Sequence, residues 1–202
     1  MNFLIEKPAE HLCYLNRKYS LQCSFDNVLE VQRLYKEQEL TDYEKVEQAL
    51  SMLVKNQMLV RVLSKSRKIE LMNLIYEQEI KLPEKSGGKK SAQRVVDFYL
   101  DSEYIYSSFR SDYGMDLIQE QGKLHWKEFV YLFQGLSDKT KIKEVIKIRS
   151  MEIPKQTKDN YKQIQSIMEL KSYYALPVEG GGGAQGLDAL FGALEQVATH
   201  GR

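Results

Sequence analysis

The sequence predicts a mainly α-helical fold that opens with a β-hairpin. Polar and apolar residues alternate over residues 11–25, and from Thr41 onward apolar residues recur every three or four positions. The second pattern recurs often enough for a compact bundle of about six helices. We expect a helical domain over residues 1–176 with an exposed linker near 83–91, a flexible glycine-rich tether over 177–186, and a short amphipathic helix within 187–202.

Two strands are expected near the N-terminus, joined by the turn Asn16-Arg17-Lys18. Such a turn would place Cys13 opposite residue 20 or 21, so that Cys23 would lie away from it. No CxxC motif accompanies the two cysteines, and both are expected to be free and reduced. Asp26 is expected to cap the helix that follows. The buried face of the hairpin is expected to contain Leu12, Tyr14, Tyr19, Leu21, Cys23 and Phe25.

Capping residues mark the ends of several helices. Thr41 and Glu44 form a capping box, in which each side chain satisfies a free backbone N–H of the other residue. The periodic segment 66–82 ends at Pro83. Farther along, Asp101 is expected to cap a helix, and Gly114 is expected to end it because glycine adopts a left-handed conformation at little cost.

The stretch LHWKEFVYLFQGL, residues 124–136, predicts a core helix rather than a reactive site. His125 lies at the start of this helix without a second histidine, a cysteine or a triad arrangement near it, which favours a structural or solvated role. The apolar residues fall on one helical face and comprise Trp126, Phe129, Val130, Phe133 and Leu136.

Two further helices are expected on either side of Pro154, over residues 140–151 and 157–176. The first is expected to bury Ile142, Val145 and Ile146, with Met151 as a further candidate. The second is expected to bury Tyr161, Ile164, Ile167, Met168 and Leu170 or Tyr174. Their outward faces are expected to carry Lys139, Lys141, Lys143, Lys147, Arg149, Lys155, Lys158 and Lys162. Interleaved acidic residues favour a solvated basic face, and contact with nucleic acid stays open as the alternative.

Composition argues against several classes of protein. Lys+Arg total 29 against 28 for Asp+Glu, so no large net field would attract nucleic acid or an anionic membrane. No apolar run is long enough for a membrane span, and the N-terminus lacks the pattern of a signal peptide, so a cytoplasmic protein is expected. Asp112 and Asp116 are too few for a metal site, and the run GGGGAQG lacks the context of a phosphate loop. We therefore expect no enzyme activity, no cofactor and no metal.

The C-terminal segment carries the candidate binding residues. Behind the glycine tether, an apolar stripe predicts a helix too short to be stable alone. This helix is expected either to fold back onto its own domain or to dock in a groove of another protein or subunit, and both alternatives stay open. The predicted partner-binding residues are Leu187, Leu190, Phe191, Leu194 and Val197.

Several motifs together resemble the phage gene product fifteen family of tailed phages and prophages of Gram-positive bacteria. They are Tyr-Ile-Tyr-x-x-Phe at 104–109, Tyr-Gly-x-Asp-Leu at 113–117, Leu-His-Trp at 124–126, Gln-Gly-Leu at 134–136, Arg149 before a Pro- and Lys-containing break, and LDALFGAL at 187–194. The N-terminal hairpin and first helix also look like those of the family. The chain differs in having Lys127 where many members have a second Trp, and in having a glycine tether where others are acidic.

The resemblance implies a function without catalytic residues. Family members are similar in setting to the tail assembly chaperones of long-tailed phages, which bind the tape measure protein and help tail tube subunits to assemble around it. The resemblance therefore implies a chaperone that binds tape measure and/or tail tube protein, acts in the bacterial host cytoplasm and is absent from the mature virion. The alternatives are a structural virion component of the tail or connector, and a nucleic-acid-binding phage protein.

Overall fold

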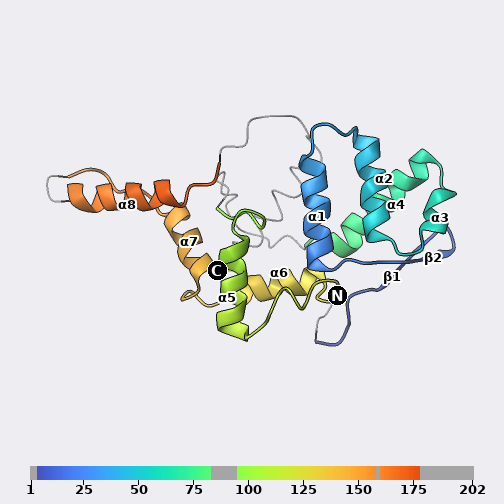
Figure 1. Ribbon diagram of the computed structural model, residues 1–202, viewed down its shortest axis with the longest axis horizontal. Coiled ribbons are helices and arrows are strands. Elements are labelled where there is room, and N and C mark those ends of the chain that lie inside the picture. The colour runs from blue at the N-terminus through green and yellow to red at the C-terminus, as the bar shows by residue number, and fades with distance from the viewer. Residues whose placement is uncertain (1–3, 83–94, 158–159, 178–202) are drawn as a thin grey trace. The chain divides into compact units, whose positions relative to one another are not determined.

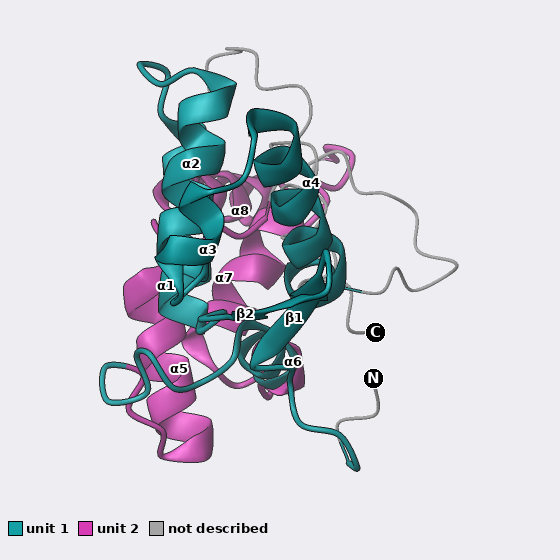
Figure 2. Cartoon of the chain, turned by 90° about the vertical axis from the view of Figure 1, so that its right-hand side faces the viewer, with its two compact units in different colours: residues 1–84, 118–132, 182–194 teal, residues 85–117, 133–181, 195–202 magenta. Residues whose placement is uncertain are grey.

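The computed structural model describes residues 4–82, 95–157 and 160–177 (Figure 1). The chain divides into two compact units, which Figure 2 colours separately. The described part of unit 1 comprises residues up to 82 together with 118–132, and that of unit 2 comprises residues 95–117 and 133–177 apart from 158–159. The N-terminal hairpin and most of the helices of the first half of the chain therefore belong to unit 1.

The N-terminal hairpin pairs β1 (His11–Tyr14) with β2 (Arg17–Ser20) in antiparallel register. Its turn consists of Leu15 and Asn16, whose φ angles of 49° and 59° are those of a type I′ turn. The predicted turn was wrong, and so was the predicted pairing, since Cys13 lies opposite Lys18. A two-residue turn matches the twist of the strands and needs positive φ, which Asn16 tolerates well. Cys13 and Cys23 are both free thiols.

Four α-helices of unit 1 follow the hairpin: α1 (Phe25–Lys36), α2 (Asp42–Leu53), α3 (Gln57–Arg61) and α4 (Lys65–Ile75). The predicted capping box at α2 is confirmed, with the Thr41 N–H donating to Glu44 Oε2 over 2.8 Å and the Glu44 N–H donating to Thr41 Oγ1 over 3.3 Å. The predicted cap of α1 was wrong, because Ser24 occupies the N-cap position. Asp26 instead accepts the N–H of Gly122 over 2.9 Å and so fixes the loop that precedes α6.

A π-helical turn, η1 (Tyr76–Ile80), continues directly from α4. Its wider hydrogen bond joins the Lys81 N–H to the Tyr76 carbonyl over 2.8 Å. Ile80 is fully buried, and its carbonyl accepts the indole N–H of Trp126 over 3.0 Å. The π turn therefore provides the acceptor for the largest side chain of the core.

Helix α6 (Trp126–Gly135) contributes residues 126–132 to unit 1 and residues 133–135 to unit 2. In unit 1, Trp126 stacks on Phe129 with ring centroids 5.9 Å apart, and Phe129 stacks on Phe25 at 4.8 Å. The predicted core stripe is confirmed, since every one of its residues is buried. Full burial of each such side chain contributes about 1.5–3 kcal/mol, which makes this helix a main source of stability.

Unit 2 is built from α5 (Ser102–Tyr113), α7 (Lys141–Ser150) and α8 (Tyr161–Tyr173), with the end of α6. Gly114 ends α5 with a φ of 64°, as predicted. Helix α7 buries Ile148 in place of the predicted Ile146, which is half-buried. Phe98 meets Phe133 edge-on at 5.2 Å in the core of this unit.

The predicted fold class is confirmed: the protein is mainly α-helical and begins with a two-stranded hairpin. The short helix α3 was not foreseen because its five residues are too few to show a helical period. Over the described residues, no helix is both long and apolar enough to cross a membrane. The predicted linker near 83–91, most of the tether and the amphipathic segment 187–202 lie outside the described residues.

Candidate partner-binding surface

The predicted partner-binding residues, Leu187, Leu190, Phe191, Leu194 and Val197, lie outside the described residues. The described part of the chain offers a different candidate in unit 2, on helix α8. In Figure 1, the extended segment that follows α7 runs away from α5 and α7, and α8 (orange) runs back beside it. We refer to residues 151–157 and 160–173 together as the arm.

Local polar contacts fix the far end of the arm. Asn160 precedes α8, and its side chain accepts the N–H of Thr157 over 2.7 Å and donates to the carbonyl of Lys155 over 2.9 Å. Asparagine suits this position because its short polar side chain bonds to nearby backbone groups. The extended segment and the helix are thereby joined where the chain reverses.

Helix α8 has an apolar face, but none of its residues is buried. Tyr161 is 59% exposed and Met168 is 54% exposed, while Ile164 and Ile167 are half-buried. The predicted burial of this stripe was therefore wrong. The period of 3.6 shows that a helix has an apolar face, yet the same pattern arises whether that face meets the protein's own core or another surface. We call Tyr161, Ile164, Ile167 and Met168 the α8 stripe.

A buried ion pair anchors the arm to the rest of unit 2. Arg149, in the last turn of α7, donates to both carboxylate oxygens of Asp101 over 2.6 and 2.8 Å, and both residues are buried. Two further N–H groups of its guanidinium donate to the carbonyls of Val95 and Tyr174, over 3.0 and 2.6 Å. Arg149 was predicted on an outward face, and this prediction was wrong. Its planar guanidinium satisfies four acceptors around it, which offsets the desolvation of the charge.

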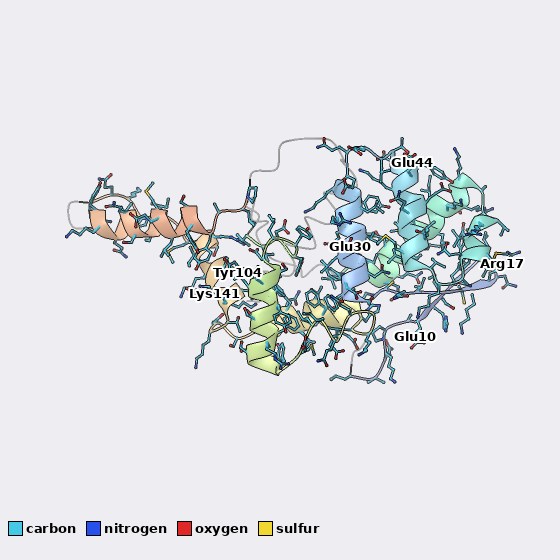
Figure 3. The ribbon with its side chains drawn as sticks, viewed as in Figure 1. Glu10, Arg17, Glu30, Glu44, Tyr104 and Lys141 are labelled. Carbon is cyan, nitrogen blue, oxygen red and sulfur yellow. The ribbon has the colours of Figure 1, made fainter. Side chains whose placement is uncertain are left out.

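Tyr174, just after α8, is held by three further contacts, which come from Lys141 and Tyr104, the two residues of unit 2 that Figure 3 labels. The Lys141 ammonium donates to its hydroxyl over 2.9 Å and lies 5.1 Å from its ring centroid. The ring of Tyr104 meets it edge-on at 6.1 Å. Lys171 adds two bonds from α8, to the carbonyls of Arg149 and Met151, each over 2.7 Å. One end of the helix is thus firmly fixed, while the α8 stripe stays accessible to solvent.

These contacts change the interpretation of the basic cluster. Arg149 forms the buried ion pair with Asp101, and Lys141 also forms an ion pair with Glu144 over 3.1 Å. Lys143 donates to the carbonyl of Gln134 over 3.1 Å. Three of the predicted surface cations therefore have structural partners within unit 2, which weakens the case for a phosphate-binding face.

A second cluster, in unit 1, brings together titratable residues that are distant in sequence. His125 Nε2 lies 3.7 Å from Glu79 Oε2, and neither atom has a hydrogen-bond partner among the described residues. Cys23 lies next to this cluster, since its carbonyl accepts the backbone N–H of Trp126, the residue after His125, over 2.8 Å. The sequence did not reveal this cluster because η1 supplies the carboxylate from 46 positions upstream of His125.

The electrostatics of this cluster oppose nucleophilic catalysis. Burial raises the pKa of the Cys23 thiol to about 12, with a smaller contribution from the charge of Glu79. Burial, assisted by the charge of Lys127, lowers the pKa of His125 to about 4. Burial also raises the pKa of the Glu79 carboxyl. An activated cysteine needs the reverse arrangement, a thiolate stabilised beside a protonated imidazole.

The two aspartates of the acidic motif contact neighbouring side chains of unit 2. Asp112 accepts the N–H and the hydroxyl of Ser137, over 2.7 and 3.1 Å. Asp116 lies 3.4 Å from the hydroxyl of Tyr106. Across the described residues, no group of three or more histidine, cysteine or acidic side chains is placed to hold a metal ion.

Comparison with known proteins gives one informative match. A sequence model of the family described as Bacteriophage Gp15 protein matches residues 9–176, which includes the hairpin, the core helices and the arm. Neither the search of curated proteins nor the search of solved structures found a match. The family match covers most of the chain and agrees with the motifs at 104–136 and with the hairpin. The chain therefore belongs to the Bacteriophage Gp15 protein family and is a phage protein.

Proposed function

We propose that this phage protein is a non-catalytic tail assembly chaperone that binds the tape measure protein and/or the tail tube protein transiently. The observation that carries the proposal is the exposed α8 stripe on an otherwise well-anchored arm. An apolar helical face in water is stabilised when it packs against an apolar groove or helix of a partner. Moderate apolar area also suits a contact that has to be released once the tail is built.

The absence of catalysis is part of the proposal. In the cluster of Cys23, Glu79 and His125, burial keeps the thiol and the imidazole neutral near pH 7 and raises the pKa of the Glu79 carboxyl. These protonation states suit a buried structural cluster better than a reactive one. The proposed activity therefore consists of binding alone, in the host cytoplasm.

A pull-down with matched variants tests the binding step. The bait is the full-length chain, and the prey is the tape measure or tail tube protein of the same phage. Met168→Glu places a charge on the α8 stripe and is expected to reduce capture at least about tenfold, equivalent to about 1.4 kcal/mol. Ser166→Glu adds the same charge to the same helix on its exposed polar face and is expected to leave capture unchanged.

The alternatives predict other results. A structural component of the tail or connector would be present in purified virions in stoichiometric amount, whereas the chaperone is expected to be absent from them by immunoblotting. A protein that acts on nucleic acid would bind DNA with a steep dependence on salt, whichever charge the α8 stripe carries. Equal capture by Met168→Glu and Ser166→Glu would mean that the tail protein does not bind the α8 stripe.

A further inference from the structure

We propose that unit 1 has a binding surface of its own, on α3 and the end of the hairpin, for a protein segment that combines acidic and apolar side chains. The surface shares no residue with the α8 stripe, so the proposal goes beyond the chaperone function and does not depend on it. Four cations and two apolar residues form this surface. We call it the α3 patch, and its members are Arg17, Lys18, Lys55, Met58, Arg61 and Val62.

The sequence concentrates positive charge around α3. Residues 48–69 contain no acidic residue and five cations, which are Lys55, Arg61, Lys65, Arg67 and Lys68. The whole chain has a net charge of +1, so the acidic residues that balance these cations lie in other segments. A local excess of this kind attracts anionic groups even though the molecule as a whole has almost no net field.

Backbone pairing brings two further cations of the hairpin to this stretch. The Lys55 N–H donates to the Ser20 carbonyl over 2.8 Å. The Asn56 side chain accepts the Ser20 N–H over 2.9 Å and donates to the Lys18 carbonyl over 3.0 Å. Figure 1 shows the end of the hairpin beside α3, and Figure 3 labels Arg17 at that end. The fold of unit 1 therefore gathers cations that are distant in sequence.

The acidic residues that border this stretch are already bound. Glu47 pairs with the Lys68 ammonium, and Glu70 lies 3.6 Å from the Arg67 guanidinium. The four cations of the α3 patch are all exposed, and they form no ion pair with any side chain that the structure describes. Their charges are therefore available to an anionic partner.

Two exposed apolar side chains lie among these cations. Helix α3 buries only Val60, whereas Met58 is 74% exposed and Val62, the residue after the helix, is 69% exposed. The Gln57 side chain fixes the start of α3, since it donates to two carbonyls in the last turn of α2, each over 3.1 Å. A helix held in this way presents Met58 and Val62 to solvent in a fixed position.

This combination of side chains distinguishes between classes of anionic partner. Carboxylates would pair with Arg17 and Arg61 through two parallel N–H bonds each. Phosphates of nucleic acid would do the same, but they would leave the apolar side chains against a charged backbone. A membrane surface would gain little, because the strength of such binding increases with the buried apolar area and α3 offers only two exposed apolar residues. A protein segment with acidic and apolar residues matches both parts of the α3 patch.

Fluorescence anisotropy with the full-length chain tests the proposal. The probe is a labelled amphipathic peptide of about 18 residues that contains glutamate, leucine and alanine, which is long enough to form a helix. The double variant Lys55→Glu with Arg61→Glu is expected to weaken its binding at least about tenfold. Lys139→Glu with Lys147→Glu, at exposed positions of unit 2, changes the net charge by the same amount and is expected to retain the affinity within about threefold.

Further arms separate the apolar contribution and the other classes of partner. Met58→Gln keeps the charge of the patch and is expected to weaken binding of the acidic peptide at least about threefold. A peptide with glutamine in place of glutamate, a labelled DNA duplex and vesicles of phosphatidylserine are all expected to bind more weakly than the acidic peptide. Met168→Glu, on the α8 stripe, is expected to leave binding of the peptide unchanged, so a failure of the chaperone proposal can be told apart from a failure of this one.

Several outcomes would overturn the proposal. Equal losses for the two double variants would mean that net charge alone attracts the peptide. Tighter binding of DNA or of the vesicles than of the acidic peptide would assign the α3 patch to nucleic acid or to lipid. Equal binding of the glutamine peptide, an unchanged affinity of Met58→Gln, or no binding of the acidic peptide up to about 1 mM would also contradict it.

Discussion

Replacing Arg149 with methionine removes the anchor of the arm while keeping much of the aliphatic stem. The change leaves Asp101 as a buried carboxylate whose remaining bond partner among the described residues is the N–H of Asp97, at 2.9 Å. It also deprives the carbonyls of Val95 and Tyr174 of their donors. Breaking a buried pair by removing one partner costs about 3–5 kcal/mol, because an uncompensated charge stays buried. We expect Arg149→Met to lower the free energy of unfolding by an amount in that range.

A double-mutant cycle isolates the pair. Asp101→Asn alone is expected to cost about 3–5 kcal/mol, since it strands the guanidinium, and the combined variant is expected to cost about 2–3 kcal/mol less than the sum of the two single changes. Urea unfolding followed by far-UV circular dichroism provides the free energies. Lys147→Met, at an exposed position on α7, serves as the control and is expected to stay within about 0.5 kcal/mol of the unaltered chain.

Two results would refute this reasoning. A loss below about 1 kcal/mol for Arg149→Met would be the response of a surface cation, as the sequence suggested, and would mean that the buried pair does not form. Additive effects in the cycle would mean that Arg149 and Asp101 do not stabilise the fold through each other.

Further predictions concern unit 1 and the end of α5. Trp126→Ala is expected to lower the free energy of unfolding, measured with urea, by about 3–5 kcal/mol. Trp126→Phe is expected to lower it by about 1–2 kcal/mol, because the Ile80 carbonyl loses its hydrogen-bond donor. Equal stability of Trp126→Ala and the unaltered chain would reject the core assignment. Gly114→Ala is expected to lower the free energy of unfolding by about 1 kcal/mol. The added Cβ would meet no other atom, but the positive φ is strained for alanine. An unchanged stability would mean that α5 does not end in a left-handed residue. His125→Gln is expected to be tolerated within about 1 kcal/mol at pH 7. The pKa of His125 is lower in the folded state than in the unfolded state, because burial disfavours the charged imidazole. The stability contributed by the neutral imidazole is therefore present above pH 6.5 and is lost as the pH falls toward 4. Between pH 8 and 5, the free energy of unfolding of the unaltered chain should therefore fall by about 1–2 kcal/mol more than that of His125→Gln, after allowance for partial solvent contact. Parallel pH profiles of the two proteins would contradict the lowered pKa of His125.

Local signals in the sequence predicted most of the helices. The capping box of Thr41 and Glu44 and the left-handed Gly114 depend on neighbouring residues only, so their chemistry can be recognised along the chain. The stripe from Trp126 to Leu136 was predicted because five bulky residues on one face make a core position the simplest interpretation.

The features that the sequence did not reveal depend on distant partners. Arg149 looked like another surface cation because its acceptors are contributed by Val95, Asp101 and Tyr174, none of which is close to it in sequence. The α8 stripe looked like core because amphipathicity does not identify the surface that a helix meets. The turn at Leu15 was misplaced because the alternation of strand residues fixes the buried face more firmly than it fixes the residues that reverse the chain.

The π turn η1 restricts how the length of this chain can vary. A π turn holds one residue more than an α-helical turn, so deletion of Gln78 would close it into an ordinary turn and rotate the residues beyond it by about 100°. Such a rotation would move the Ile80 carbonyl away from the Trp126 indole and the Gln78 position away from the Lys127 ammonium that bonds to it. Substitutions of single side chains in this turn should therefore be tolerated better than changes in its length. Insertions and deletions should be tolerated in the surface loops and should disrupt the fold at this turn.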